Sequence, residues 1–261
     1  MNDYLLKNDR DRDCPTDGGD RFQIEVDNAI FSVDLDRHRV LVLLVRQRNS
    51  SRFDRWCLPG TFVRLGESLE AAAHRIMSER IRARNLYLEQ LYTFDGHSDP
   101  LDDRLSHQQL PPPDDGNLTL ENPYISVSYF ALVRWDEARI MGEGAIGTSW
   151  YPLNQVPPLI ANYDRILQYG YKRLRNKLEY SPVAFEVLPE TFTLSEVYQL
   201  YTAVLGEDFS DYSNFRSRLL KLGFLSDTGQ KVSRGAGRPA SLYRFDARAF
   251  EPLKDKPMVF I

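Results

Sequence analysis

The sequence predicts an α/β domain followed by a winged helix-turn-helix domain. Three observations indicate this order: strand-like apolar runs and a helical pattern alternate over the first 155 residues, a long helical pattern follows, and the remaining segment combines capped helix patterns with a β-hairpin. A chain of 261 residues is long enough for two domains. Its 42% hydrophobic and 12% aromatic residues supply both cores and exclude a disordered chain.

The composition excludes several classes of protein. The longest strongly apolar run covers residues 40–45 and cannot cross a bilayer, since a spanning helix needs about 20 residues. The first 20 residues alternate in charge and lack the apolar segment of a signal peptide. Cys14 and Cys57, with four histidines, provide neither a disulfide framework nor a zinc cluster. We therefore expect a cytoplasmic protein without a membrane partner, a metal or a cofactor.

Charge is distributed unevenly along the chain. The net charge is −4, from 33 basic and 37 acidic residues, which by itself argues against nucleic-acid binding. Residues 212–245 reverse this balance, with seven basic side chains and one acidic side chain, Asp227. Because local charge decides phosphate binding, this segment is a candidate nucleic-acid surface.

The first domain, residues 22–155, follows a polar extension over residues 1–21 that we expect to be flexible. Ser68 can cap a helix over residues 68–82, where apolar side chains recur at helical spacing. A proline-rich segment over residues 98–122 is expected to be an irregular insertion. The expected strands cover residues 22–26, 29–33, 39–46, 86–94 and 124–135.

A long helical pattern over residues 161–180 connects the two domains. Its apolar residues recur at helical spacing, and it ends just before Pro182, which disfavours helix in the preceding residue. We therefore assign residues 156–181 to a linker helix, residues 182–250 to the winged helix-turn-helix domain and residues 251–261 to a C-terminal tail.

Capping signals define the helices of the second domain. Thr193 and Glu196 form the pattern of a capping box and predict a helix to about residue 205. Asp211 can cap a second helix, which Gly223 is placed to end. The strands of the following hairpin are expected over residues 224–225, 231–233 and 241–245.

The second of these helices and the hairpin loop have the chemistry of a DNA-binding surface. On the helix, Phe215 and Leu219 share an apolar face, and hydroxyl, amide and basic side chains occupy the other. Such side chains suit the major groove, although an ordinary solvated face explains the helix equally well. The hairpin loop carries cations, glycines and no acid, which favours phosphate contact. The expected DNA-binding residues are Ser213, Asn214, Arg216, Ser217, Lys221, Lys231, Arg234 and Arg238.

A motif in the first domain resembles the Nudix box, whose pattern is G-x5-E-x7-R-E-U-x-E-E-x-G-U. It covers residues 58–80, LPGTFVRLGESLEAAAHRIMSER. Anchoring the pattern on Glu67 aligns Arg75 with the arginine of the box. The resemblance covers about residues 22–155 and implies the α/β/α sandwich of Nudix proteins.

Departures from the Nudix box bear on catalysis. In Nudix hydrolases, glutamates of the box hold divalent cations that neutralise a diphosphate and activate water. Here Ile76 and Arg80 stand at two of these positions, while Glu79 keeps a third. A guanidinium repels a cation and can pair with a phosphate in its place. We therefore expect no catalytic residues and a cleft that binds a nucleotide-like ligand without cleaving it; one weak metal between Glu67 and Glu79 is the alternative.

Several side chains near the box have both a structural and a ligand-binding interpretation. We expect Arg75 to hold the box loop to the helix by a salt bridge rather than to contact ligand. Trp56 either anchors a loop or stacks on a base or sugar, Arg46 and Arg64 are either ligand contacts or solvated, and Cys57 is expected to be a packed thiol. The expected effector-binding residues are Arg46, Trp56, Arg64, Glu67, Glu79 and Arg80.

Residues 192–201, 214–225 and 237–245 resemble the C-terminal domain of Nudix-related transcriptional regulators of the NrtR type. Together with the altered box, this resemblance spans about residues 22–246. It implies a homodimer that binds a palindromic operator of double-stranded DNA and responds to a small-molecule effector. In that family the effectors are ADP-ribose-type nucleotides, for regulators of NAD metabolism, or sugar derivatives, for regulators of carbohydrate metabolism.

A divergent Nudix hydrolase is the competing hypothesis. In that case the C-terminal domain would serve for dimerisation or protein docking, and the chain would cleave nucleoside diphosphate derivatives with Mg²⁺. Ile76 and Arg80 argue against it. The sequence leaves open the effector, the operator, and whether the effector releases or promotes DNA binding.

Overall fold

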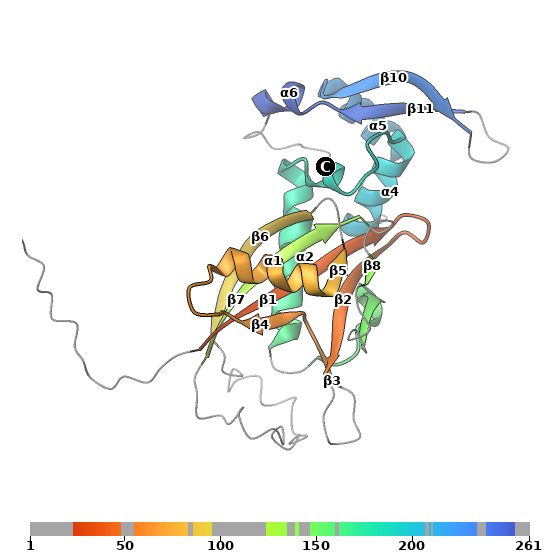
Figure 1. Cartoon of the computed structure of the whole chain (residues 1–261). Helices are drawn as coiled ribbons and strands as arrows, with labels where there is room; N and C mark the ends of the chain where they lie inside the picture. The colour runs from red at the N-terminus through yellow and green to blue at the C-terminus, as the bar shows by residue number, and fades with distance from the viewer. Residues whose placement is uncertain are drawn as a thin grey trace, which may run out of the picture.

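A computed structural model of the chain shows a β-sheet with helices on both faces and a smaller domain of helices and a hairpin packed beside it (Figure 1). The structure describes residues 23–47, 55–82, 86–95, 124–134, 139–140, 147–159, 162–206, 209, 211–233 and 239–253. The expected extension over residues 1–21 and the expected insertion over residues 98–122 lie outside the described residues.

In the described part of the chain, seven strands form the main sheet, in the order β3-β2-β1-β7-β6, with β4 also paired to β1 and β9 also paired to β2. The pairing of β1 with β7 is parallel, and the other pairings in this sheet are antiparallel. The strands are β1 (Gln23–Asp34), β2 (Arg39–Gln47), β3 (Arg55–Cys57), β4 (Gly60–Phe62), β6 (Leu86–Asp95), β7 (Tyr124–Val133) and β9 (Thr148–Pro152). A separate antiparallel pair joins β5 (Ile81–Arg82) to β8 (Arg139–Ile140), and a short 3₁₀ helix covers Leu153–Gln155.

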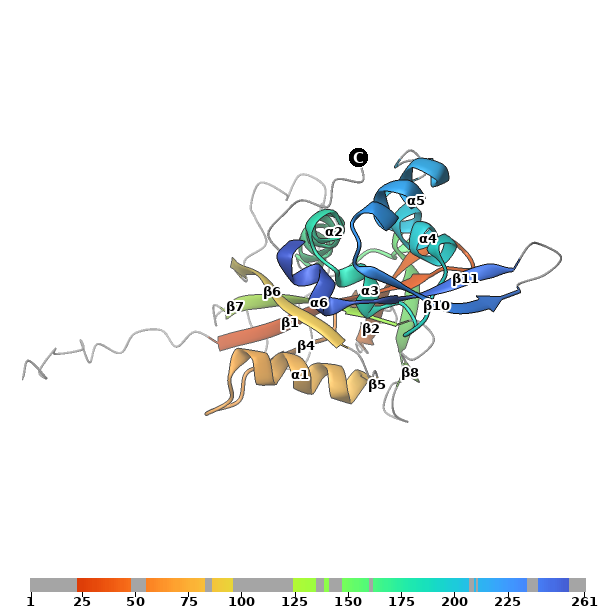
Figure 2. The same cartoon turned by 90° about the horizontal axis from the view of Figure 1, so that it is seen from above.

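Different helices cover the two faces of the central strand β1. Helix α1 (Leu69–Arg80) buries its apolar stripe against Val26 and Ile30. Helix α2 (Tyr163–Tyr180) covers the opposite face, around Ala29 and Phe31. Side chains alternate between the faces of a strand, so these two pairs point in opposite directions. Figure 2 shows α1 and α2 on opposite sides of the sheet, which confirms the predicted α/β/α sandwich.

Strand β1 runs unbroken from Gln23 to Asp34, so the prediction of two strands over residues 22–26 and 29–33 was wrong. Asp27 and Asn28 interrupt the apolar pattern, and this interruption suggested a break. Inside the sheet each has a partner: the Ser126 hydroxyl donates to Asp27 at 2.5 Å, and the Asn28 amide donates to the Ala73 carbonyl at 3.0 Å. Tertiary hydrogen bonds therefore allow polar side chains within a buried strand.

Most other expected elements of the first domain are present. The strands expected over residues 39–46 and 86–94 are β2 and β6, and β7 covers most of the strand expected over residues 124–135. Ser68 caps α1 as predicted, because its hydroxyl accepts from the Ala71 N–H at 3.1 Å. The short strands β3, β4 and β9 were not predicted, since pairing with β1 or β2 defines them rather than a periodic pattern of their own.

The second domain contains the predicted helices and hairpin. Thr193 and Glu196 form the predicted capping box, Asp211 caps the second helix, and Gly223 has a positive φ of 76°. The strands expected over residues 224–225 and 231–233 are instead one strand with a register shift, where Gly229 has a φ of 72°. The elements of the second domain are α3 (Val183–Glu186), α4 (Leu194–Leu205), α5 (Tyr212–Lys221), β10 (Leu225–Val232), β11 (Ala240–Phe245), α6 (Ala247–Phe250) and a 3₁₀ turn, Glu251–Leu253.

One continuous apolar cluster joins the two domains. It includes Phe31 and Leu44 of the sheet, Leu174 of α2, and Val197 and Phe224 of the second domain. The helix expected as a linker corresponds to α2, which packs against the sheet on one side and α4 on another. None of the helices in the described residues is both long enough and apolar enough to span a membrane.

Gly170 on α2 is a position where we expect any larger side chain to destabilise the fold. A Cβ at this position would lie 3.1 Å from atoms of both Ala29 and Phe31. Gly170→Leu should therefore lower the free energy of unfolding by about 2 kcal/mol, because overpacking a filled core costs about 1–3 kcal/mol. Urea denaturation measures the effect, with Gln168→Leu at an exposed position of α2 as the control. Equal stability of the two variants would contradict the close packing.

Candidate functional site

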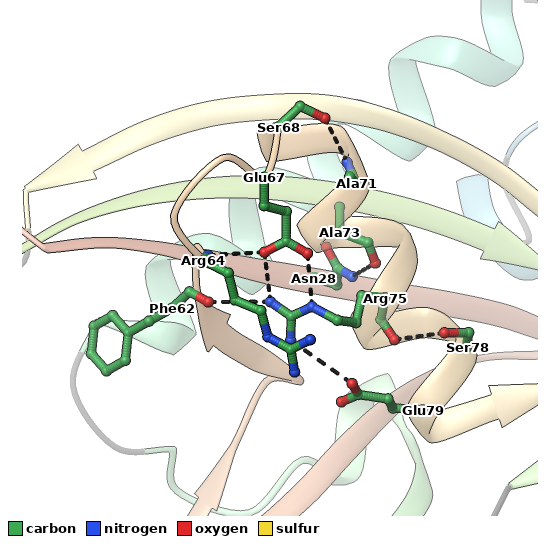
Figure 3. A network of polar contacts seen from close by, with 10 residues as sticks. All are labelled: Asn28, Phe62, Arg64, Glu67, Ser68, Ala71, Ala73, Arg75, Ser78 and Glu79. Carbon is green, nitrogen blue, oxygen red and sulfur yellow. Dashed lines mark hydrogen bonds and ion pairs between the residues drawn. The ribbon is translucent and has the colours of Figure 1, made fainter.

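An ion pair fixes the loop that leads into α1 (Figure 3). Arg75 on α1 donates from Nε to Oε1 of Glu67 at 2.8 Å and from Nη2 to Oε2 at 2.8 Å. Its Nη2 also donates to the Phe62 carbonyl at 3.2 Å, and the backbone N–H of Arg64 donates to Glu67 at 2.9 Å. The predicted salt bridge of Arg75 is therefore confirmed, and it ties the box loop to the helix.

Glu67 is held in its charged form by these donors. The side chain of Arg75 and then the backbone N–H of Arg64 lower the pKa of Glu67 to about 2. Both carboxylate oxygens already accept hydrogen bonds from the protein. The observed role of Glu67 is to position the loop, while its expected contact with an effector stays a prediction.

The remaining box positions face different surroundings. Ile76 is 2% exposed and packs in an apolar cluster with Val26 and Val127. The Glu79 side chain is 51% exposed, and its Oε1 lies 3.8 Å from Nη1 of Arg75. Arg80 is the last residue of α1 and is half-buried. Among these three positions, one faces the core, one faces an arginine and one is itself a cation.

Two carboxyl groups that sequence reasoning missed lie beside the box on β1, the buried Asp27 and the half-buried Glu25. Gly60 of the box is the cross-strand partner of Asp27. A Cβ at Gly60 would lie 2.2 Å from Oδ1 of Asp27 and 3.4 Å from Oε1 of Glu25, so a side chain at this position would have to displace Asp27. The available signal was the spacing, because charged residues two apart in an apolar strand share one face.

Burial raises the pKa of both carboxyl groups. The pKa of Glu25 rises to about 8, from burial and then from repulsion by Asp27. Burial raises the pKa of Asp27 to about 6, although hydrogen bonds from neighbouring hydroxyl groups oppose it. At neutral pH the pair therefore presents a neutral acid beside a carboxylate.

Cys57 and Arg80 share the electrostatic environment of this pair. Burial raises the pKa of the Cys57 thiol to about 12, the charges of Asp27 and Glu25 add to this, and Arg80 opposes it. The thiol donates to the Val45 carbonyl at 3.3 Å, so it is packed as predicted. The charges of Asp27, Glu25 and Arg80 therefore all act on the Cys57 thiol.

Trp56 and Arg46 lie opposite each other where β3 pairs with β2. The half-buried Trp56 ring packs edge-on against Tyr151, with 4.9 Å between ring centroids, so its anchoring role is confirmed. Arg46 is exposed at the end of β2, and its backbone N–H donates to the Gly147 carbonyl at 2.6 Å. Arg64 is exposed on the box loop. The expected effector contacts of these three side chains stay predictions.

Helix α5 presents a polar face to solvent. Phe215 and Leu219 are fully buried, as predicted, and Phe215 packs against Tyr198 and Tyr201 of α4. Asp211 caps α5 by accepting from the backbone N–H of residue 214 at 3.0 Å, and it also binds the amide side chain there. The exposed side chains of α5 include the expected Ser213, Asn214, Arg216, Ser217 and Lys221.

The hairpin carries the rest of the expected DNA-binding residues. Lys231 is exposed on β10, where it pairs with Ser241 of β11. Figure 1 shows this hairpin projecting from the second domain. Arg234 and Arg238 lie outside the described residues. The six expected DNA-binding residues that the structure describes are therefore all exposed, on α5 and β10.

Known proteins resemble this chain over nearly its whole length. A family model described as the NUDIX domain matches residues 26–169, and one described as the AraR C-terminal winged HTH domain matches residues 180–261. The ADPR responsive transcriptional repressor NtrR of Acinetobacter baylyi is 30% identical over 231 residues, covering 87% of this chain and 83% of that protein. The chain belongs to the Nudix-related transcriptional regulators.

Two crystal structures of NrtR from Shewanella oneidensis resemble this Nudix-related regulator. The complex of NrtR with a 27mer DNA has a TM-score of 0.65 and 27% identity, and the match covers 87% of this chain and 94% of that chain. A second NrtR structure has a TM-score of 0.67 and 26% identity, with coverage of 90% and 98%. These matches span both domains and confirm the predicted fold class.

Burial of Glu25 makes the stability of this Nudix-related regulator depend on pH. Its pKa of about 8 in the folded chain lies above the ordinary value of 4.5, so folding favours the protonated form. The stability that protonated Glu25 contributes is fully present below about pH 4.5 and is lost as the pH rises through about 8. Glu25→Gln should therefore flatten the fall in unfolding free energy between about pH 5 and pH 9, by up to several kcal/mol at about 1.4 kcal/mol per pKa unit.

Urea denaturation across this pH range measures the effect, with Glu70→Gln on the exposed surface of α1 as the matched control. At pH 9 the Glu25→Gln chain should be more stable than the wild type, and the control should follow the wild type throughout. A Glu25→Gln chain whose stability falls as steeply as that of the wild type would show that Glu25 is not neutral when folded.

Proposed function

We propose that this chain represses transcription by binding an operator as a homodimer, and that an ADP-ribose-like nucleotide in its Nudix-type domain is the effector. The observation that carries this proposal is the similarity, across both domains, to a repressor whose name records a response to ADPR. That relative is bacterial, and a repressor of this kind acts where the chromosome lies, which supports the cytoplasmic location expected from the sequence.

The exposed face of α5 supports DNA binding. Hydroxyl, amide and basic side chains on one face of a helix can reach base edges, while Arg216 and Lys221 can also reach phosphates. Burial of Phe215 and Leu219 fixes which face points outward. In a homodimer, two such helices reading a palindrome would lie about 34 Å apart, or a multiple of that distance, so an inverted repeat is the expected operator.

The site beside the box supports an effector with phosphates and hydroxyl groups. Arg80 supplies a cation that can pair with a phosphate. Glu25, the less buried of the two carboxyl groups, supplies a protonated carboxyl group that can donate to a hydroxyl group at neutral pH. The half-buried ring of Trp56 lies on β3, which pairs with β2. An ADP-ribose-like nucleotide has both chemical features.

The geometry of the box supports binding without hydrolysis. A divalent cation needs several oxygen ligands at about 2.0–2.6 Å. Ile76 offers none and is buried, both oxygens of Glu67 are engaged by Arg75 and Arg64, and Arg80 would repel the ion. The residues at these positions do not fit the cation of a Nudix hydrolase. We therefore assign no catalytic step to this domain.

Incubation with ADP-ribose tests this part of the proposal. ADP-ribose should survive in the presence of Mg²⁺ or Mn²⁺, because Ile76 and Arg80 replace two of the oxygen ligands that would hold the cation. Chromatography of the products measures the release of AMP, and a Nudix hydrolase of ADP-ribose serves as the positive control. A turnover above about 1 s⁻¹, within the ordinary range of enzymes, would overturn the assignment as a regulator without catalysis.

Substitutions in the second domain test the assignment of DNA binding. Lys231→Ala should weaken binding to all sequences alike and reduce the slope of log affinity against log salt by about one, because it removes a phosphate contact. Arg216→Ala should change the sequence preference, with about 1–3 kcal/mol lost for a good base contact. Fluorescence anisotropy with an operator obtained by DNA selection provides the measurement.

Arg248→Ala, at an exposed position on α6 of the same domain, is the matched control for loss of charge. If Lys231→Ala and Arg216→Ala both bind the operator as tightly and as selectively as the control, the basic face is an ordinary solvated surface. The proposed DNA-binding function would then be abandoned.

A further inference from the structure

Helix α2 contacts both candidate sites. At its first residue, the side chain of Tyr163 hydrogen-bonds to the carboxyl group of Asp27. Further along, α2 packs against α4, the first helix of the helix-turn-helix pair. Its 18 residues span about 27 Å at ~1.5 Å per residue, so one rigid element reaches from the carboxyl pair to the second domain.

Two side chains of α2 hold the end of α4. The Tyr171 hydroxyl donates to the Val204 carbonyl at 2.8 Å, and Nη2 of Arg175 donates to the Leu205 carbonyl at 3.3 Å. These are the last two residues of α4, and the last carbonyls of a helix have no acceptor role within it. Tyr171 and Arg175 lie four residues apart and therefore on the same face of α2.

The end of α4 is the point from which the chain continues to the recognition helix α5. Gly206 follows Leu205 with a φ of 104°, a conformation that favours glycine, and α5 begins at Tyr212. A return contact comes from the fully buried Tyr201 of α4, whose hydroxyl donates to the Leu178 carbonyl of α2 at 3.1 Å. A movement of α2 would therefore displace the start of α5.

The same helix is fastened to the sheet. Glu89 on β6 accepts from Arg173 at 2.8 Å and pairs with Lys177 at 2.7 Å, both on α2. Gly170 brings the backbone of α2 close to Ala29 and Phe31 on β1. Because the ion pairs of Glu89 and the packing at Gly170 are both close, a displacement of β1 or β6 would move α2 as a rigid unit.

We propose that α2 transmits effector occupancy from the Nudix-type domain to α5, through the hydrogen bonds of Tyr171 and Arg175 to the last carbonyls of α4. This role rests on the function proposed above and adds its route of regulation. The apolar contacts between the domains lie in the shared core, which includes Leu174 of α2 and Val197 of α4, and such contacts are non-directional. Hydrogen bonds are directional and weaken steeply with misalignment, which suits them to report a displacement.

Tyr171→Phe and Arg175→Gln test the proposal in the full-length chain, since each removes one hydrogen bond and Arg175 is exposed enough to be replaced without unfolding. Tyr169→Phe and Arg165→Gln, at exposed positions of the same helix, are the matched controls. Anisotropy gives the operator Kd without and with saturating ADP-ribose, and calorimetry gives the Kd of ADP-ribose. The ratio of the two operator Kd values is the coupling factor.

We expect the wild type and the controls to show a coupling factor of about 5–150, the usual range for allosteric pairs. Tyr171→Phe and Arg175→Gln should reduce that factor to its square root or less. Their operator Kd without ADP-ribose and their Kd for ADP-ribose should each stay within threefold of the wild type. This pattern separates transmission from binding at either site.

The opposing outcomes are distinct. Variants that keep the coupling factor of the wild type overturn the proposal and leave the proposed function intact. Variants that lose operator binding even without ADP-ribose also overturn it, because the hydrogen bonds of Tyr171 and Arg175 would then serve only to hold the fold. A wild-type chain that binds the operator but not ADP-ribose overturns the effector assigned under the proposed function, and this route falls with it.

Discussion

The burial of β1 on both faces is the constraint on which the rest of the structure depends. A strand in this position cannot shift by one residue without turning its apolar side chains to the wrong face, so its register is strongly defined. Neighbouring parts take their positions from it: Gly60 of the box loop pairs with Asp27, and Gly170 of α2 lies against Phe31. Both glycines mark places where another backbone approaches β1 too closely for a side chain.

The box loop shows how a motif can keep its architecture when its chemistry changes. The bidentate contact of Arg75 with Glu67 joins the loop to α1. This contact stabilises the fold and requires no metal. The position of Ile76 serves the core of the domain instead. A loop of the Nudix shape can therefore persist after the set of oxygen ligands is reduced. Binding of a ligand and its hydrolysis are separable properties of this fold.

Local signals in the sequence account for the parts that could be predicted. The capping residues Thr193 and Asp211 act within one helical turn, so α4 and α5 were found with their starting points. The short strand β4 forms through pairing with β1 and therefore could not be read from periodicity. The spacing of Glu25 and Asp27 places them on one face of β1, but the glycine that lies over them depends on that pairing. The contacts expected of long exposed side chains with an effector or with DNA remain predictions, because their partners are other molecules.

The shared core of the two domains limits how an effector could influence DNA binding. Domains joined by a flexible connection usually meet at small, polar interfaces and move about the connecting segment. Here the connecting helix α2 is packed against the sheet along its buried side, and Leu174 and Leu178 belong to the same apolar cluster as Val197 and Phe215. A ligand can shift an equilibrium only by its differential affinity for two states, and closely packed cores resist continuous deformation. The packing therefore favours coupling by a small displacement of the shared core over motion about a free hinge.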